Sequence, residues 1–159
     1  MKLVIGGAYQ GKLAYARMQY QLTDGWINGQ DCPMEAILTC RGIDHFHEYV
    51  KRMIEQTDEP VDSSNIVQDS MFRFQTDHLE EMEQQAEAFV KWLYTKNPEL
   101  VIVSTELGCG VVPIERKDRL WREAVGRICT SIAAQADEVV RVACGIGINL
   151  KKSEAKRCR

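Results

Sequence analysis

The chain has 159 residues, of which 45% are apolar, and this is enough for one domain with its own core. The net charge of −3 and the isoelectric point near 5.7 argue against a protein that holds nucleic acid through positive charge. No segment approaches the length of a membrane span, and the apolar run at residues 3–5 is too short for a signal peptide. We therefore expect a cytoplasmic protein that binds neither nucleic acid nor a membrane.

The first predicted strand, residues 2–5, runs into a stretch with the spacing of a phosphate-binding loop. The pattern is Gly, four residues, Gly, Lys and then Ser or Thr, and the chain matches it from Gly6 to Lys12 but has Leu13 at the last position. Glycines let backbone N–H groups face phosphates, the Lys reaches the terminal phosphates, and the missing hydroxyl would bind Mg²⁺. A helix predicted over residues 12–22 would place the anion at its N-terminus. The predicted nucleotide-binding residues are Gly6, Gly7, Ala8, Tyr9, Gln10, Gly11, Lys12 and Leu13, and an ordinary glycine-rich turn is the alternative.

The next elements are less regular. A turn-rich stretch precedes a second strand predicted at residues 35–40, and helical spacing of apolar residues predicts a helix from 43 to 56. Residues 57–75 show no clear period and are predicted to connect two helices. A long helix is predicted to begin with Asp77 as its cap and to end at Asn97, before Pro98.

The C-terminal half completes an alternation of strands and helices. Residues 100–104 are continuously apolar except at their end and predict a buried parallel strand, whose carboxyl end is where ligands bind in open α/β sheets. A helix at 117–135 and a strand at 138–145 follow. The alternation predicts an α/β fold of the P-loop NTPase type, with three layers and a largely parallel sheet flanked by helices. We expect a single domain at residues 1–151 and a basic, solvated tail at 152–159.

A cluster of polar residues follows the predicted second strand. On a helix Asp44, His47 and Glu48 would share one face, which suggests a metal site, but no fourth ligand occurs at a convincing spacing. A solvated or helix-capping set is therefore favoured, and we predict no metal site. Cys109 has no His near it in sequence, which favours an incidental loop thiol over a nucleophile.

The six cysteines show no paired spacing of metal ligands. In an expected cytoplasmic protein they are interpreted as reduced and mostly buried, and the six are Cys32, Cys40, Cys109, Cys129, Cys144 and Cys158. The two tryptophans that we considered as base-stacking platforms, Trp26 and Trp121, are interpreted as packing residues.

The C-terminal half also carries a specific ordered pattern. Three segments follow one another in order and nearly without gaps: the run VSTELGCGVVP at 103–113, the helix residues Arg119, Trp121-Arg122 and Gly126-Arg127, and the ending AAQADEVVRVACGIGINLK at 133–151. This series resembles the bifunctional adenosylcobinamide kinase / adenosylcobinamide-phosphate guanylyltransferase family of cobalamin biosynthesis. That family also has a phosphate loop, GGxxSGKS, at the N-terminal place where this chain has residues 6–13.

The resemblance implies an activity and a set of partners. By resemblance, the protein would phosphorylate a corrinoid hydroxyl with ATP or GTP and would assemble as a homotrimer. Lys12 and Glu106 would be catalytic, and Glu106 would act on the hydroxyl or hold water around Mg²⁺. The alternative for Glu106 is a structural role, as a carboxylate that caps a helix or loop. Three arginines at the family's basic positions would meet phosphate or a neighbouring subunit, or else form surface ion pairs: Arg119, Arg122 and Arg127.

The chain departs from the family at positions that matter for chemistry. The family has Arg and Ser where this chain has Tyr9 and Gln10, and the metal-binding Ser is Leu13. We align the family's acidic strand end, E-C-x-T, with residues 39–42, which contain no carboxylate, so Mg²⁺ would lack its usual ligands. The Asn residues of the family are Thr105 and Cys129 here.

The family's guanylylated His precedes the E-C-x-T strand, and no His occurs between residues 12 and 40. We therefore expect the guanylyltransferase step to be missing. A replacement by His45 or His47 is a minor alternative, because the family's His comes from before this strand. The alternative to an active kinase is a catalytically degenerate protein that binds a nucleotide or corrinoid for regulation or assembly.

Overall fold

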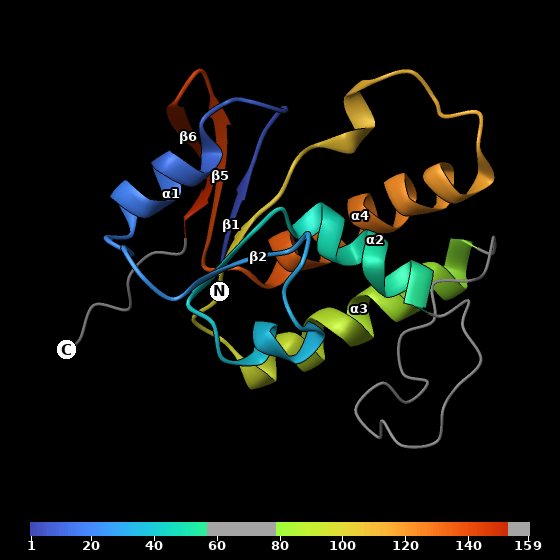
Figure 1. Cartoon of the computed structure of the whole chain (residues 1–159), viewed down its shortest axis with the longest axis horizontal. Helices are drawn as coiled ribbons and strands as arrows, with labels where there is room; N and C mark the ends of the chain where they lie inside the picture. Colours follow the sequence, from blue (N-terminus) through green and yellow to red (C-terminus); the bar gives the residue numbers. More distant parts are fainter. Residues whose placement is uncertain (57–78, 153–159) are drawn as a thin grey trace.

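Six strands form one sheet in a computed structural model that describes residues 1–56 and 79–152 (Figure 1). The strand order is β2-β3-β4-β1-β5-β6, and all neighbours are parallel except β5 and β6. The strands are β1 (Lys2–Ile5), β2 (Trp26–Asn28), β3 (Gly42–Asp44), β4 (Val101–Val103), β5 (Glu138–Ala143) and β6 (Ile146–Lys152). The predicted α/β fold with a largely parallel sheet is confirmed.

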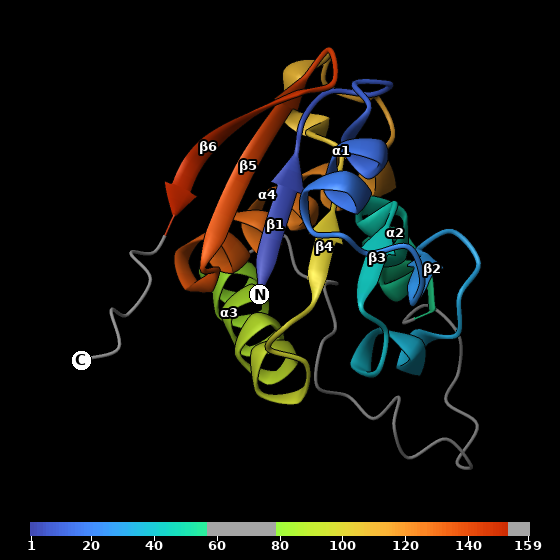
Figure 2. The ribbon, with the colours of Figure 1, turned by 90° about the vertical axis from the view of Figure 1, so that its left-hand side faces the viewer.

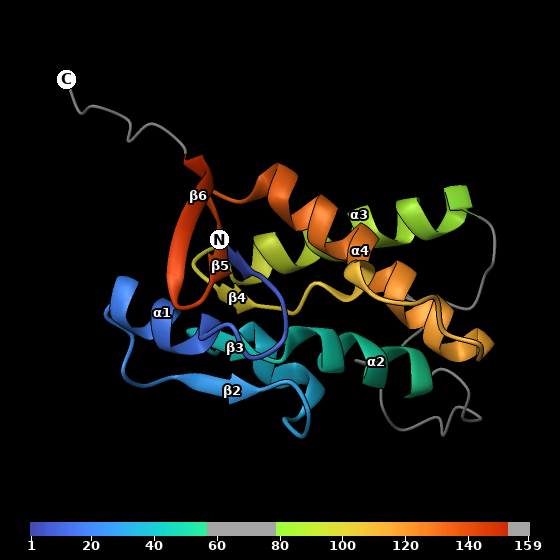
Figure 3. The ribbon, with the colours of Figure 1, turned by 90° about the horizontal axis from the view of Figure 1, so that it is seen from above.

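Helices cover both faces of the sheet. They are α1 (Lys12–Gln19), α2 (Phe46–Gln56), α3 (Leu79–Lys96) and α4 (Arg116–Gln135), with short 3-10 helices at η1 (Met34–Leu38) and η3 (Leu107–Cys109). Successive side chains of a strand point to opposite faces of the sheet, so neighbouring residues of β1 pack in different hydrophobic cores. Val4 packs in the core that includes Ala16 of α1, and Leu3 packs in the core formed with α2, α3 and α4. Figure 2 shows α1 in front of the sheet and α4 behind it, and Figure 3 shows the same layers from above.

The predicted strand at residues 35–40 is wrong. Residues 34–38 form η1, which buries Ile37, and the strand lies further on as β3. Its partner β2 falls in the stretch predicted as turns. A Cβ on Gly42 would lie 2.6 Å from the Trp26 ring, so the indole packs against the bare backbone of β3. The glycine that permits this pairing also weakened the strand signal.

The predicted strand at 138–145 is the first half of a hairpin. β5 ends at Ala143, and the chain reverses at Cys144 and Gly145, whose φ values are 50° and 78°. It returns as β6, so Lys152 belongs to the sheet and not to a tail. Residues 153–159 of the predicted tail, the connection at 57–75 and the cap Asp77 lie outside the described residues.

The end of α3 is tied to the segment between η1 and β3. The amide nitrogen of the Asn97 side chain donates to the carbonyl oxygen of Ile37 at 3.0 Å and to that of Cys40 at 2.8 Å. The backbone N–H of Asn97 donates to Leu93 at 2.8 Å, which continues the helix by one residue. One amide group therefore fixes the approach to β3, at whose end the polar cluster lies.

We predict that Asn97→Ala lowers the free energy of unfolding by about 2 kcal/mol, because the carbonyl of Cys40 loses this donor and the carbonyl of Ile37 is left with the weak thiol donor of Cys40 at 3.7 Å. Urea denaturation measures the loss. Thr95→Ala on the same helix is the control and should cost less than about 0.5 kcal/mol, because Thr95 bonds only to Lys91 at the exposed surface. Equal losses in the two variants would contradict the tie to β3.

Candidate nucleotide and phosphoryl-transfer site

The predicted phosphate loop lies between β1 and α1 and is held against the β5-β6 hairpin. Gly6 has a φ of 155°, and a Cβ at this position would lie 2.3 Å from the carbonyl oxygen of Val142. Gln10 accepts the backbone N–H of Gly145 with its carbonyl at 2.9 Å and that of Cys144 with its side-chain oxygen at 2.6 Å. The loop is thus fixed by a close backbone approach at its start and by the hairpin near its end.

Lys12 lies at the bottom of a cleft of about 490 Å³ beside this loop. Its side chain is buried, and Nζ donates to the carbonyl oxygen of Gly7 at 2.7 Å. Burial lowers the pKa of Lys12 from its ordinary value, and the negative charges of Asp44 and Glu106 oppose that shift. The cleft is walled by loop residues 8–14 and by the residues that follow β3 and β4.

Asp44 is the acidic residue at the end of β3 and lines this cleft, so the predicted absence of a strand-end carboxylate is wrong. The error follows from the misplaced strand, because residues 39–42 precede β3 and do not end it. Oδ1 of Asp44 accepts the backbone N–H of His45 at 2.8 Å, and Oδ2 lies 3.1 Å from Nδ1 of the same residue. Both oxygens of the carboxylate therefore lie close to groups of His45.

His47 is buried in the wall of the cleft. Its Nδ1 accepts the backbone N–H of Thr105 at 3.4 Å, and its ring stacks against Trp121 with centroids 6.3 Å apart. The Trp121 indole donates to the carbonyl oxygen of His47 at 2.6 Å, and Trp121 also lines the cleft, so its packing role stays a prediction. Burial lowers the pKa of His47 to about 4, and the nearby His45 and Lys12 act in the same direction. His47 is consequently neutral at pH 7 with its proton on Nε2.

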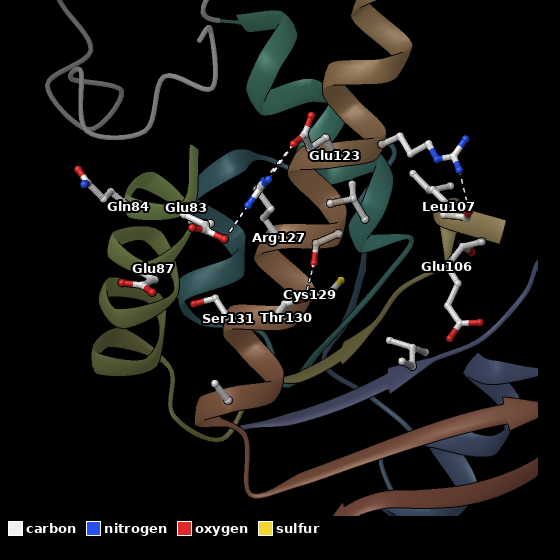
Figure 4. Close-up of a pocket in the computed structure, with 18 of the residues that line it drawn as sticks. Glu83, Gln84, Glu87, Glu106, Leu107, Glu123, Arg127, Cys129, Thr130 and Ser131 are labelled. Carbon is white, nitrogen blue, oxygen red and sulfur yellow. Dashed lines mark hydrogen bonds and ion pairs between the residues drawn. The ribbon is translucent and has the colours of Figure 1, made fainter. Parts of the chain in front are cut away.

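Glu106 is separated from the cleft by its own pairing. Its backbone N–H donates to Gly6 at 3.0 Å, but its carboxylate lies 3.0 Å from the guanidinium of Arg141 on β5. It lines a second cavity of about 1250 Å³ between α3, α4 and the loop after β4 (Figure 4). The two predicted catalytic residues, Lys12 and Glu106, therefore lie in adjoining cavities and not in one.

The three arginines of α4 face protein groups. Arg122 donates to the carbonyl oxygens of Val111 at 3.1 Å and Gly108 at 2.6 Å, and Arg119 donates to Pro113 at 3.2 Å. Arg127 lies between Glu83 and Glu123, at 2.7 and 2.9 Å (Figure 4). Two arginines thus fix the loop after β4, and the third links α3 to α4.

The described residues do not fit a protein-held magnesium ion. Leu13 offers no oxygen, Asp44 is engaged with His45, and no group of three His, Cys, Asp or Glu within 1–56 and 79–152 is arranged to bind a metal. The expectation of no metal site stays a prediction for the whole chain. The side chain of Cys109 lies outside the described part. Among the helices of that part, none is long and apolar enough to cross a membrane.

Sequence reasoning placed His45 or His47 near the nucleotide site only as a minor alternative and missed that Asp44 lines the cleft with both of them. The signal was present, because an acidic residue directly after a short apolar strand is expected at the carboxyl edge of a parallel sheet. It was hidden when the strand was assigned to residues 35–40 and Ile43 to the following helix.

We predict that His47 makes the protein sensitive to mild acid. Its pKa is about 4 in the folded state against 6.5 ordinarily, so below pH 6.5 the unfolded chain takes up a proton that the folded protein does not. Stability should fall between pH 6.5 and pH 4, by up to about 3 kcal/mol from this residue. Denaturation of wild type and His47→Gln at several pH values measures it. Parallel curves for the two proteins would contradict the prediction.

The comparisons with known proteins agree with the pattern in the C-terminal half. The family model described as cobinamide kinase / cobinamide phosphate guanyltransferase matches residues 41–150. The bifunctional adenosylcobalamin biosynthesis protein CobU of Salmonella typhimurium is 44% identical over 52 residues, which are 33% of this chain and 29% of that protein. Its namesake from Escherichia coli is 42% identical over 52 residues, with the same shares, so the matched stretch spans less than a third of either relative. Because the family model covers well over half of the chain, this protein belongs to the cobinamide kinase / cobinamide phosphate guanyltransferase family.

Proposed function

We propose that this protein binds ATP or GTP beside the phosphate loop and transfers a phosphoryl group to a corrinoid hydroxyl in cobalamin biosynthesis. One observation carries the proposal: the buried ammonium of Lys12 ends at the loop carbonyl of Gly7, inside a cleft at the carboxyl edge of the sheet. In a phosphate loop the Lys neutralises charge on the terminal phosphates, and phosphoryl transfer is mostly positioning and electrostatics. Membership of the family supports the corrinoid as acceptor.

The second cavity supports a bulky acceptor. Its volume of about 1250 Å³ exceeds that of an ordinary small-molecule pocket, and it shares Thr105 and Leu107 with the nucleotide cleft. In this proposal the corrinoid body occupies the larger cavity and its hydroxyl enters the cleft past Thr105. Both sites belong to one domain, which extends to Lys152 at the end of β6.

The proposal omits the guanylyltransferase step. A His placed before β3 is missing from the sequence, since none occurs between residues 12 and 40. The chemistry that remains is the kinase half-reaction.

A second candidate is a protein that binds nucleotide without turnover. The observation that favours it is Leu13, which lines the cleft where the phosphate-loop pattern places a hydroxyl that binds Mg²⁺. Binding and turnover must therefore be measured separately.

We predict that Lys12→Ala weakens the binding of ATP or GTP about 10- to 100-fold, because a charge-assisted contact to phosphate contributes about 1.5–3 kcal/mol. Calorimetry on wild type and variant measures the change. Lys96→Ala, an exposed lysine at the end of α3, is the control and should bind as the wild type does. Unchanged affinity in Lys12→Ala would contradict a working phosphate loop. Turnover of cobinamide by the wild type then separates the kinase from the binding protein.

We predict that Leu13→Ser increases the effect of Mg²⁺ on nucleotide affinity by about 10-fold relative to wild type, because it restores the hydroxyl of the pattern. Titrations with and without Mg²⁺ measure it. Leu13→Ala is the matched control, since it removes the same bulk without adding an oxygen. An equal response of Ser and Ala variants would show that the hydroxyl has no role in this cleft.

A further inference from the structure

We infer that His45 is the general base that takes the proton from the acceptor hydroxyl, and that Asp44 positions its imidazole; this inference rests on the proposed phosphoryl transfer. General bases act from within hydrogen-bond reach of the reacting hydroxyl, and an aspartate on the far ring nitrogen fixes the tautomer and orientation of the imidazole. Both residues line the nucleotide cleft together with Lys12.

The ring of His45 is turned so that one nitrogen faces Asp44. Nδ1 lies 3.1 Å from Oδ2 of Asp44 and, although the angle is not that of a formed hydrogen bond, Nδ1 is buried and meets no other partner among the described residues. The His45 side chain is 42% exposed. Since Nδ1 is buried, the exposed edge carries Nε2, which is the nitrogen free to accept a proton.

The backbone holds His45 in an uncommon conformation. Its φ of 52° is left-handed, which costs about 1 kcal/mol or more in a residue other than glycine. The turn is fixed from several sides: Gly29 donates to Asp44 at 2.8 Å, and the carbonyl oxygen of His45 accepts from Glu48 at 2.9 Å and Tyr49 at 3.2 Å. A Cβ on Gly29 would lie 2.4 Å from the same carbonyl oxygen, so β2 packs closely against this turn. The surroundings therefore hold the imidazole at the edge of the cleft.

The second histidine of the cleft cannot take this role. Nδ1 of His47 accepts from Thr105, which leaves the proton on Nε2, and its side chain is 10% exposed. The titratable groups that line the cleft with His45 are Tyr9, Lys12, Asp44, His47 and Glu48. Of these, Asp44 is the one in contact with a ring nitrogen of His45, since the ring centroids of the two histidines are 5.8 Å apart.

The proposed step is balanced in atoms and electrons. The hydroxyl oxygen of the acceptor forms a bond to the γ-phosphorus, and the bond from that phosphorus to the bridging oxygen breaks with release of ADP or GDP. The hydroxyl proton moves to Nε2 of His45 and is later lost to solvent. Asp44 holds Nδ1–H throughout and stabilises the imidazolium that forms.

The first test reads the tautomer of His45 without requiring activity. Protein labelled with ¹⁵N-histidine is studied by long-range ¹H–¹⁵N spectra at pH 8, and His45→Asn and His47→Gln assign the signals. Asn suits the left-handed backbone at position 45. We expect the proton of His45 on Nδ1 and that of His47 on Nε2, and Asp44→Asn should reduce the Nδ1–H form of His45. A proton on Nε2 of His45 in the wild type overturns the inference.

The second test is the pH dependence of cobinamide phosphorylation. We expect His45→Asn to lower kcat on the order of 10²- to 10³-fold, to abolish the decrease in rate toward acid pH, and to leave the nucleotide Kd within about 3-fold. Asp44→Asn should lower kcat at least about 10-fold with the KM for cobinamide nearly unchanged. The control Asp24→Asn, at an exposed surface pair with Arg41, should match the wild type.

The outcomes separate the inference from the proposed function. If the wild type binds nucleotide but does not phosphorylate cobinamide, the proposed function is contradicted. The NMR measurement of the His45 tautomer then tests only whether Asp44 positions the imidazole. Turnover retained in His45→Asn overturns the base assignment while the proposed function stands. An acid-labile phosphoryl or nucleotidyl group found on His45 also overturns it, because the ring nitrogen would then bond to phosphorus and not to a proton.

Discussion

The parallel pairing of β1 with both β4 and β5 is the constraint on which the rest of the structure depends. It places the carboxyl ends of β1, β3 and β4 at one edge of the sheet. The phosphate loop, Asp44 and the backbone of Thr105 meet there although they are far apart in sequence. Ligands bind at this edge in open α/β sheets because the chain leaves each strand there and its loops are free to vary.

The charges at this edge are few and interdependent. Burial of Lys12 lowers its pKa, and the carboxylate of Asp44 opposes that shift while it also engages His45. The pKa of His47 is lowered by burial and by the neighbouring Lys12, so this imidazole adds no second positive charge at pH 7. Among the described residues that line the cleft, Lys12 therefore supplies the lysine charge, and a change at Asp44 would alter the pKa of this ammonium.

The parts of the fold with a local cause were predictable from sequence. The loop at residues 6–13 is a short motif between β1 and α1, and β4 is continuously apolar because both of its faces are buried. The incorrect predictions concern features that depend on residues far away in the sequence. β3 needs Gly42 beside Trp26, and the carboxylate of Glu106 is drawn toward Arg141 on β5, 35 residues later. No local pattern reports such partners, so the residues of the motif were found but their division between two cavities was not.

Two residues that line the cleft have different physical explanations. Gln10 uses its side chain to hold the β5-β6 hairpin, so it has a structural reason at a place where the family offers Ser. His45 has a left-handed backbone, which is uncommon outside glycine although histidine is among the residues enriched there, and its Nδ1 faces the carboxylate of Asp44. Strained residues of this kind cluster at sites where the side chain has a task, and the aspartate against Nδ1 indicates which task that is. A chain that had only lost catalytic residues would have no need to keep this pair in the cleft of its phosphate loop.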